Sequence, residues 1–138
     1  IKIKMATTAQ INIDSSTLMD NFPIAWTATG SLYKAGTTTD ISETTGLGRR
    51  KLAATTKVDL ITWANETATA DKSAKLYVKN TSTSETQYVQ VYINSVELGR
   101  LYGGDWMWMP YSGGTNEDLE VAPSTDDAVV LEYMLFFE

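Results

Sequence analysis

The side chains of this chain that could do chemistry are carboxylates and aromatic rings, because its 138 residues include no histidine and no cysteine. Histidine titrates near neutral pH, and cysteine and histidine together supply most strong nucleophiles and transition-metal ligands. Their joint absence removes most of the standard catalytic constellations. We therefore expect no catalytic residues, no bound metal and no cofactor, and we expect a binding or structural role.

Carboxylates gather in two stretches that resemble loops, residues 116–120 and the pair Asp126 and Asp127. Such clusters could supply the hard oxygen ligands that Ca²⁺ prefers, but the spacing of an EF-hand is absent. Two of the 17 acidic residues could also form a glycosidase pair. That kind of site is defined by separation in space, and nothing in the sequence singles out a pair. Solvated loop charges are the favoured interpretation.

The densest aromatic segment is 106–111, which we expect to be one strand. Along it Trp106 and Trp108 share one face, while Met107, Met109 and Tyr111 share the other. One interpretation is a central strand that the domain's own sheets cover on both sides. Another is contact with a partner, since Trp, Tyr and Met are enriched at protein interfaces. A third is a platform on which sugar rings stack. We expect at least one of the two faces to contact another subunit.

The basic cluster Arg49, Arg50 and Lys51 follows a glycine-containing turn. It could be a solvated loop, a docking point for an acidic protein surface, or a nucleic-acid contact. The net charge of −6 and the pI near 4.6 argue against binding to a nucleic acid backbone. No apolar run approaches the roughly 20 residues of a membrane helix, and no signal peptide is visible. Arg49 and Arg50 are therefore candidate protein contacts, and we expect neither nucleic acid nor membrane as a partner.

Beyond residue 56 the sequence alternates between apolar and polar residues in short segments separated by turn signals. Seven strands are expected, at 57–63, 75–80, 88–93, 96–102, 106–111, 119–121 and 129–137. No window has helical periodicity. This spacing predicts an all-β fold, an antiparallel β-sandwich or jelly-roll-like barrel. The expected core comprises Leu76, Val78, Val89, Val91, Leu131, Tyr133 and Leu135.

Residues 1–56 are rich in Thr, Ser, Ala and Gly and carry only short apolar patches. Strand-like pieces at 1–5, 11–13 and 24–33 would need a sheet to pair with. We therefore expect an N-terminal arm over 1–56, with one or two pairing strands, and a body over 57–138. The polar composition predicts that the arm, up to about Lys51, is mobile in the free subunit and ordered in an assembly.

The segments 75–82, 88–93, 99–106 and 131–136, together with Pro110, resemble small virion structural proteins of tailed bacteriophages. The resemblance covers 75–138 and depends on a strand-and-turn pattern with a Gly-Asp-Trp turn at 104–106. It implies a β-sandwich or jelly-roll-like subunit of the virion without catalytic residues. Capsid decoration, or cementing, is the expected role, with the major capsid protein or other virion subunits as partners and a homo-oligomer as the expected state. A tail or fibre component and a carbohydrate-binding module are the alternatives.

Overall fold

The chain folds entirely into strands over the residues that its computed structural model describes, which are 6–19, 22–53, 55–62, 73–111, 117–124 and 129–138. These strands form several antiparallel sheets and no closed barrel, so the expected all-β class is confirmed. Within these ranges there is no helix long and apolar enough to cross a membrane. The chain divides into two compact units, Ile1–Ile41 and Ser42–Glu138, which we call the ribbon unit and the body.

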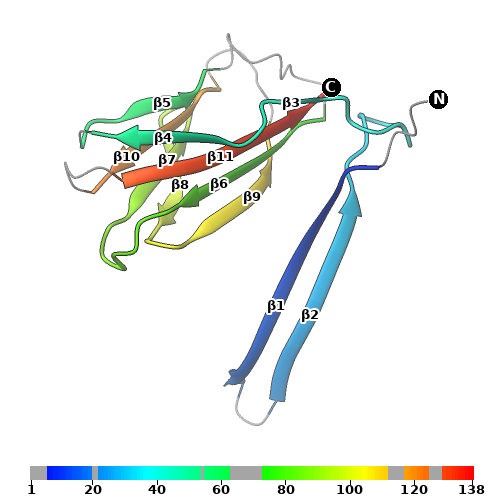
Figure 1. Cartoon of the computed structure of the whole chain (residues 1–138), viewed down its shortest axis with the longest axis horizontal. Helices are drawn as coiled ribbons and strands as arrows, with labels where there is room; N and C mark the ends of the chain where they lie inside the picture. Colours follow the sequence, from blue (N-terminus) through cyan, green and yellow to red (C-terminus); the bar gives the residue numbers. More distant parts are fainter. Residues whose placement is uncertain (1–5, 20–21, 54, 63–72, 112–116, 125–128) are drawn as a thin grey trace. The chain divides into compact units, whose positions relative to one another are not determined.

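The body contains two sheets, whose strands Figure 1 labels. In the first sheet β11 (Val129–Phe137) lies between β6 (Lys75–Asn80) and two short strands, β3 (Glu43–Thr44) and β4 (Gly48–Leu52), and β9 (Trp106–Pro110) lies beyond β6. The second sheet has the order β5 (Val58–Ile61), β10 (Leu119–Pro123), β7 (Val89–Ile93) and β8 (Val96–Leu101). Successive strands from β4 onward therefore alternate between the sheets, except for the β7–β8 hairpin.

Each of the seven strands expected beyond residue 56 corresponds to one of the strands β5 to β11. Residues 42–56, which we assigned to the arm, belong instead to the body, because β3 and β4 pair with β11. Arg49 and Arg50 consequently lie in a strand and not in a loop. The expected strand at 1–5 lies outside the described residues.

The buried faces of both sheets contribute to one hydrophobic core. Six of the seven expected core residues are buried, and Tyr133 is partly buried and packs against them. Directly opposite Tyr133 in the register is Gly48, where a Cβ would lie 3.0 Å from the tyrosine ring. A larger residue than glycine would therefore displace this ring. The core is completed by Leu52, Leu60, Ile61, Ala74, Leu101, Tyr111, Leu119, Val121 and Val129.

The corner where the chain passes from β8 to β9, and thus between the sheets, is organised around Asn80. This fully buried side chain donates hydrogen bonds to the carbonyls of Gln87 and Leu101, each at 3.0 Å, and accepts one from the Ser82 amide. Gly103 lies against the same segment, where a Cβ would come within 2.2 Å of the Ser84 carbonyl oxygen. Gly103 therefore requires glycine because of this close approach, and Gly104, the first residue of the Gly-Asp-Trp turn, requires it because of its positive φ of 91°.

The ribbon unit is built on a long hairpin of β1 (Thr8–Met19) and β2 (Phe22–Ser31), visible in Figure 1. The pieces at 11–13 and 24–33, for which we expected a partner sheet, lie in this hairpin, where 11–13 pairs with 26–28. Of the unit's described residues, Leu32 and Ile41 are the buried hydrophobic ones, and the Ile41 amide donates to the Leu32 carbonyl at 2.9 Å. The hairpin itself, here called the ribbon, has no core.

Candidate functional site

The expected partner-binding strand β9 is an edge strand with two unlike faces. Met107 and Met109 pair with Val78 and Leu76 of β6 and pack against the core. Tyr111, just after the strand, is 3% exposed, and its hydroxyl donates to the Glu117 carbonyl at 2.8 Å. The body's own core therefore covers Tyr111, which we had expected to meet a partner.

Trp106 and Trp108 point to the opposite side of the sheet, away from the core. The register sets Trp108 beside Tyr77, and Tyr77 beside Met134. We call this surface the aromatic face. Its strand positions are Trp106, Trp108 and Pro110 of β9, Lys75, Tyr77 and Lys79 of β6, Val130, Glu132, Met134 and Phe136 of β11, Arg49 and Lys51 of β4, and Thr44 of β3.

The side chains of the aromatic face contact one another. The rings of Trp108 and Phe136 are tilted at 56° with centroids 5.8 Å apart, a common arrangement for interacting rings. Trp106, nearer the start of the strand, is 48% exposed. A tryptophan this exposed, beside half-buried rings, makes a continuous surface that a second molecule could cover.

Glu132 is the carboxylate at the centre of the polar part of this face. Arg49 donates to its Oε2 from both Nε, at 3.1 Å, and Nη2, at 2.9 Å. The Tyr77 hydroxyl donates to the other oxygen, Oε1, at 3.3 Å. Burial, and then the negative charge of Glu132 and this hydrogen bond, raise the pKa of Tyr77 above its ordinary value. Arg49 is thus tied to the sheet through a carboxylate, and both belong to the face.

The charge of the aromatic face is opposite to that of the whole chain. Its strand positions carry four cations, Arg49, Lys51, Lys75 and Lys79, against the single carboxylate of Glu132. The face therefore has a net charge of +3, although the chain as a whole has −6. Long lysine and arginine side chains can also cover apolar surface with their methylene groups.

Arg50 points to the other side of β4 from Arg49. Its guanidinium donates to the Asp59 carbonyl, in the second sheet. Since β4 and β5 lie at edges of different sheets, this hydrogen bond joins those edges. Arg50 therefore has a structural role in the body, which the sequence did not indicate.

The outward face of the second sheet also carries tyrosines, but its own cations cover them. The guanidinium of Arg100 lies 4.6 Å from the centroid of the Tyr88 ring, which is 5.4 Å from the ring of Tyr102. The ammonium of Lys57 lies 5.2 Å from the centroid of Tyr92. Cation–π contacts of this kind stabilise the rings within the subunit. This face is consequently a weaker candidate for binding than the aromatic face.

The ribbon has an apolar side and a polar side, which follow from its register. Directly paired residues project to the same side, and Ile11 pairs with Ala28 while Ile13 pairs with Trp26. Alternation along β2 places Phe22 and Ile24 on that side too. We call this surface the ribbon's apolar face. The other side is polar, and there Asn12 accepts hydrogen bonds from Thr27 at 2.7 Å and from Gln10 at 3.3 Å.

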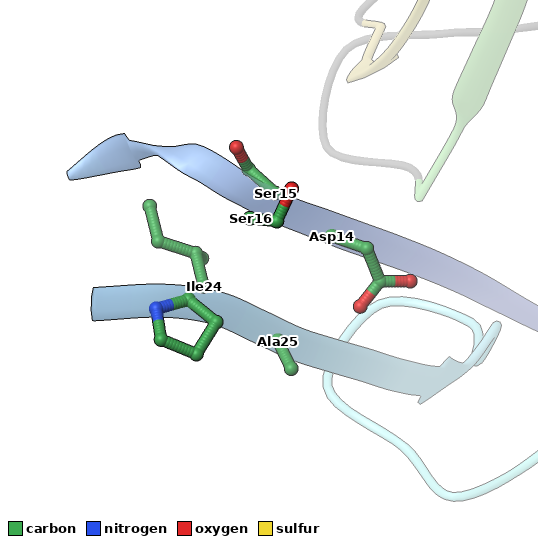
Figure 2. A pocket seen from close by; sticks show the side chains of 6 residues that line it. Asp14, Ser15, Ser16, Ile24 and Ala25 are labelled. Atoms are coloured by element: carbon green, nitrogen blue, oxygen red, sulfur yellow. The ribbon is translucent and has the colours of Figure 1, made fainter. Parts of the chain in front are cut away.

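The pairing of the ribbon becomes irregular between Ser15 and Met19, opposite Pro23. The Ser15 hydroxyl accepts hydrogen bonds from the Thr17 and Leu18 amides there. Figure 2 shows the open depression at this point, with Ser15 and Ile24 on one side of the ribbon and Asp14 and Ala25 on the other. With Asp14 as its one charged side chain, the depression has no cluster of groups for catalysis.

Beyond this irregular pairing the ribbon exposes large apolar side chains. Leu18 is 77% exposed and Phe22 is 70% exposed. Neither was among the binding residues expected from the sequence, nor was Trp26, although the alternation in 22–28 was a usable signal. Tyr77, Met134 and Phe136 were also missing from that set, and their alternation likewise placed them opposite the core.

The acidic stretches do not form a metal site within the described part of the chain, where no group of three or more possible ligands occurs. Glu120 instead pairs with Lys57 at 3.3 Å and accepts a hydrogen bond at 2.7 Å from the amide of Ser95, in the β7–β8 turn. Asn116, Asp126 and Asp127 lie outside the described residues. Glu120 therefore stabilises a turn.

Comparison with known proteins found no relative, so the function must be inferred from the surfaces described above. No protein-family model, no curated protein and no solved structure matches this chain.

Proposed function

We propose that this chain is a structural protein of a tailed-phage virion that decorates the assembled capsid and stabilises it. The observation that carries the proposal is the contrast between a body with its own core and a ribbon with none. An isolated two-stranded hairpin is marginally stable in water. A subunit whose longest strands lack a core is suited to an assembly in which neighbours cover them.

We also propose that the body is a β-sandwich with jelly-roll topology. Support comes from the strand orders β4-β11-β6-β9 and β5-β10-β7-β8, in which chain neighbours alternate between facing sheets. Eight strands in two such sheets are the pattern of jelly rolls, which occur in viral capsid proteins and in lectins. Because one fold serves many functions, this topology is an analogy, and the surfaces must carry the argument.

The proposed mechanism is mass action. A subunit that bridges capsid proteins binds the assembled shell and not its separated parts, so binding lowers the free energy of the assembled state. The contacts would come from the ribbon and the aromatic face, with the major capsid protein and further copies of this chain as partners. No chemical step is required of any residue.

A carbohydrate-binding module is the second candidate, and the exposure of Trp106 favours it. An exposed indole ring offers a flat apolar surface on which a sugar ring can stack. Aromatic rings next to it, at Trp108 and Phe136, would extend such a platform. Binding on a glycan array that is lost in Trp106→Ala would support this function in place of decoration.

The decisive measurement is the copy number of the chain in purified virions, obtained by quantitative mass spectrometry against the major capsid protein. Decoration predicts a number comparable with that of the capsid protein. A few copies per particle would instead indicate a tail or fibre component, and absence from the particle would reject the proposal. As a functional test, adding the protein to capsids stripped of it should raise their melting temperature.

A further inference from the structure

We propose that the ribbon's apolar face packs on the aromatic face of a second copy of this chain, so that the protein self-associates through these two surfaces. The inference rests on the proposed function in one respect, that the ribbon is covered in an assembly. It concerns the isolated protein and does not depend on the assembly being a virion.

The two surfaces are compatible in shape. The ribbon strands have 12 and 10 residues, which corresponds to about 33–40 Å at roughly 3.3 Å per residue. Phe22, Ile24, Trp26 and Ala28 form a row on one side of β2, over the first seven of its ten residues. Packed sheets lie about 10 Å apart with their side chains interdigitated. The ribbon could therefore lie on the aromatic face as an additional layer of sheet.

The two surfaces are also compatible in charge. Between Lys4 and Lys34 the chain has no lysine or arginine, and its charged residues there are Asp14 and Asp20. The aromatic face, by contrast, has a net charge of +3 from four cations and one carboxylate. A ribbon without cations would not be drawn to an anionic lipid surface or to a phosphate backbone. It would approach the cations of the aromatic face without like-charge repulsion.

A second copy of this chain is the one partner that could cover both the ribbon's apolar face and the aromatic face. Each chain presents one apolar ribbon face and one aromatic face, so a single kind of partner covers the two. The outward face of the other sheet is a poorer match, because Arg100 and Lys57 already lie over its tyrosine rings. Trp26 of the ribbon and Trp106 of the aromatic face are each about half exposed and become the expected anchors, since tryptophan is enriched among residues that dominate binding.

Sedimentation velocity of the full chain over a range of concentrations tests the proposal. The wild type should form species that are multiples of 15.2 kDa. Trp26→Glu, on the ribbon, and Trp106→Glu, on the aromatic face, should each raise the dissociation constant at least about tenfold. Circular dichroism and thermal unfolding should show that both variants keep the fold, and Phe22→Ser replaces Trp26→Glu if that variant does not.

Matched controls separate these faces from other surfaces. Thr27→Glu changes the residue next to Trp26 on the polar side of the ribbon. Leu98→Glu changes a residue that is 52% exposed on β8, in the other sheet. Both controls should associate as the wild type does. Equal weakening by the controls would overturn the proposal.

Mixing the two defective variants provides the sharpest test. Trp26→Glu retains an intact aromatic face, and Trp106→Glu retains an intact ribbon, so the mixture should form a one-to-one complex that neither variant forms alone. Failure to form this complex overturns the pairing of the two faces. A wild type that remains monomeric at every concentration also overturns it. A virion copy number remains measurable in either case and separately tests the proposed function.

Discussion

The body and the ribbon are both antiparallel β-structure with alternating apolar residues, yet they use that alternation differently. In the body, the apolar sides of both sheets contribute to one hydrophobic core, and side chains such as Leu76, Val91 and Leu131 are buried. In the ribbon, the apolar side faces no other element of its unit's described residues, and Phe22 and Trp26 remain exposed. The same local pattern therefore produces a core in one region and an exposed apolar surface in the other.

This difference shows that the pairing of two strands does not by itself make them stable. The ribbon has the longest strands of the described chain and a regular register over most of its length. Backbone hydrogen bonds contribute little net free energy by themselves, because water offers the unfolded chain equivalent bonds. Burial of apolar area is the dominant favourable term, and the hydrophobic core that provides it lies in the body and not in the ribbon.

Proteolysis should show the largest contrast between the two regions. At concentrations too low for association, chymotrypsin should cut the ribbon, at sites such as Phe22 and Trp26, at least about a hundredfold faster than the body, because regions with few buried contacts open at little free-energy cost. Mass spectrometry of the fragments gives the sites and rates. Trypsin is the control, since the ribbon has no lysine or arginine. Similar chymotryptic rates in both regions would show that the ribbon is protected within the single chain.

Core truncation should give the next largest effect. Leu131→Ala removes a fully buried side chain of β11 and should lower the free energy of unfolding by about 2–5 kcal/mol through lost transfer energy and a cavity. Ile13→Ala in the ribbon should lower it by less than about 1 kcal/mol, because that side chain is exposed. Urea denaturation followed by circular dichroism measures both. Comparable losses would mean that the ribbon contributes to the cooperative core.

Glycine substitutions should give effects of opposite sign in the two regions. Gly103→Ala places a Cβ within 2.2 Å of the Ser84 carbonyl and should destabilise the body by about 1–3 kcal/mol through overpacking. Gly30→Ala in β2 meets no atom within 4 Å and should be neutral or slightly stabilising, since alanine restricts the unfolded chain. Melting temperatures of the two variants decide the matter. A stabilising Gly103→Ala would contradict the close approach at this corner.

The smallest expected effect concerns the titration of Tyr77 on the aromatic face. Its pKa is raised from the ordinary value of 10.0 by burial and by Glu132. The folded chain therefore holds this proton more tightly than the unfolded chain, and stability should fall as the pH rises above 10.0 through the folded pKa. Glu132→Gln should move the pKa part of the way back. The absorbance difference between the wild type and Tyr77→Phe during alkaline titration isolates this group, and an unchanged titration in Glu132→Gln would argue against the contact.

The strands and faces of the body were predictable because side chains alternate along any strand, a geometric property of the chain itself. The absence of histidine and cysteine likewise removed most chemistry without reference to a fold. The expected core followed directly from the alternation. The sequence also indicated that Trp106 and Trp108 lie opposite Met107 and Met109.

Tertiary structure alone decided which of two apolar faces is covered. Alternation separates Trp106 from Met107 but does not say which side faces the core, and it did not reveal that Tyr111 is buried. Pairing of β3 and β4 with β11, some 80 residues away along the chain, was equally hidden. Short polar strands have little signal of their own, and their pairing is selected by distant partners. For β1 and β2 the missing information was different: alternation shows that a strand has an apolar side but does not identify its partner, and these two strands pair with each other.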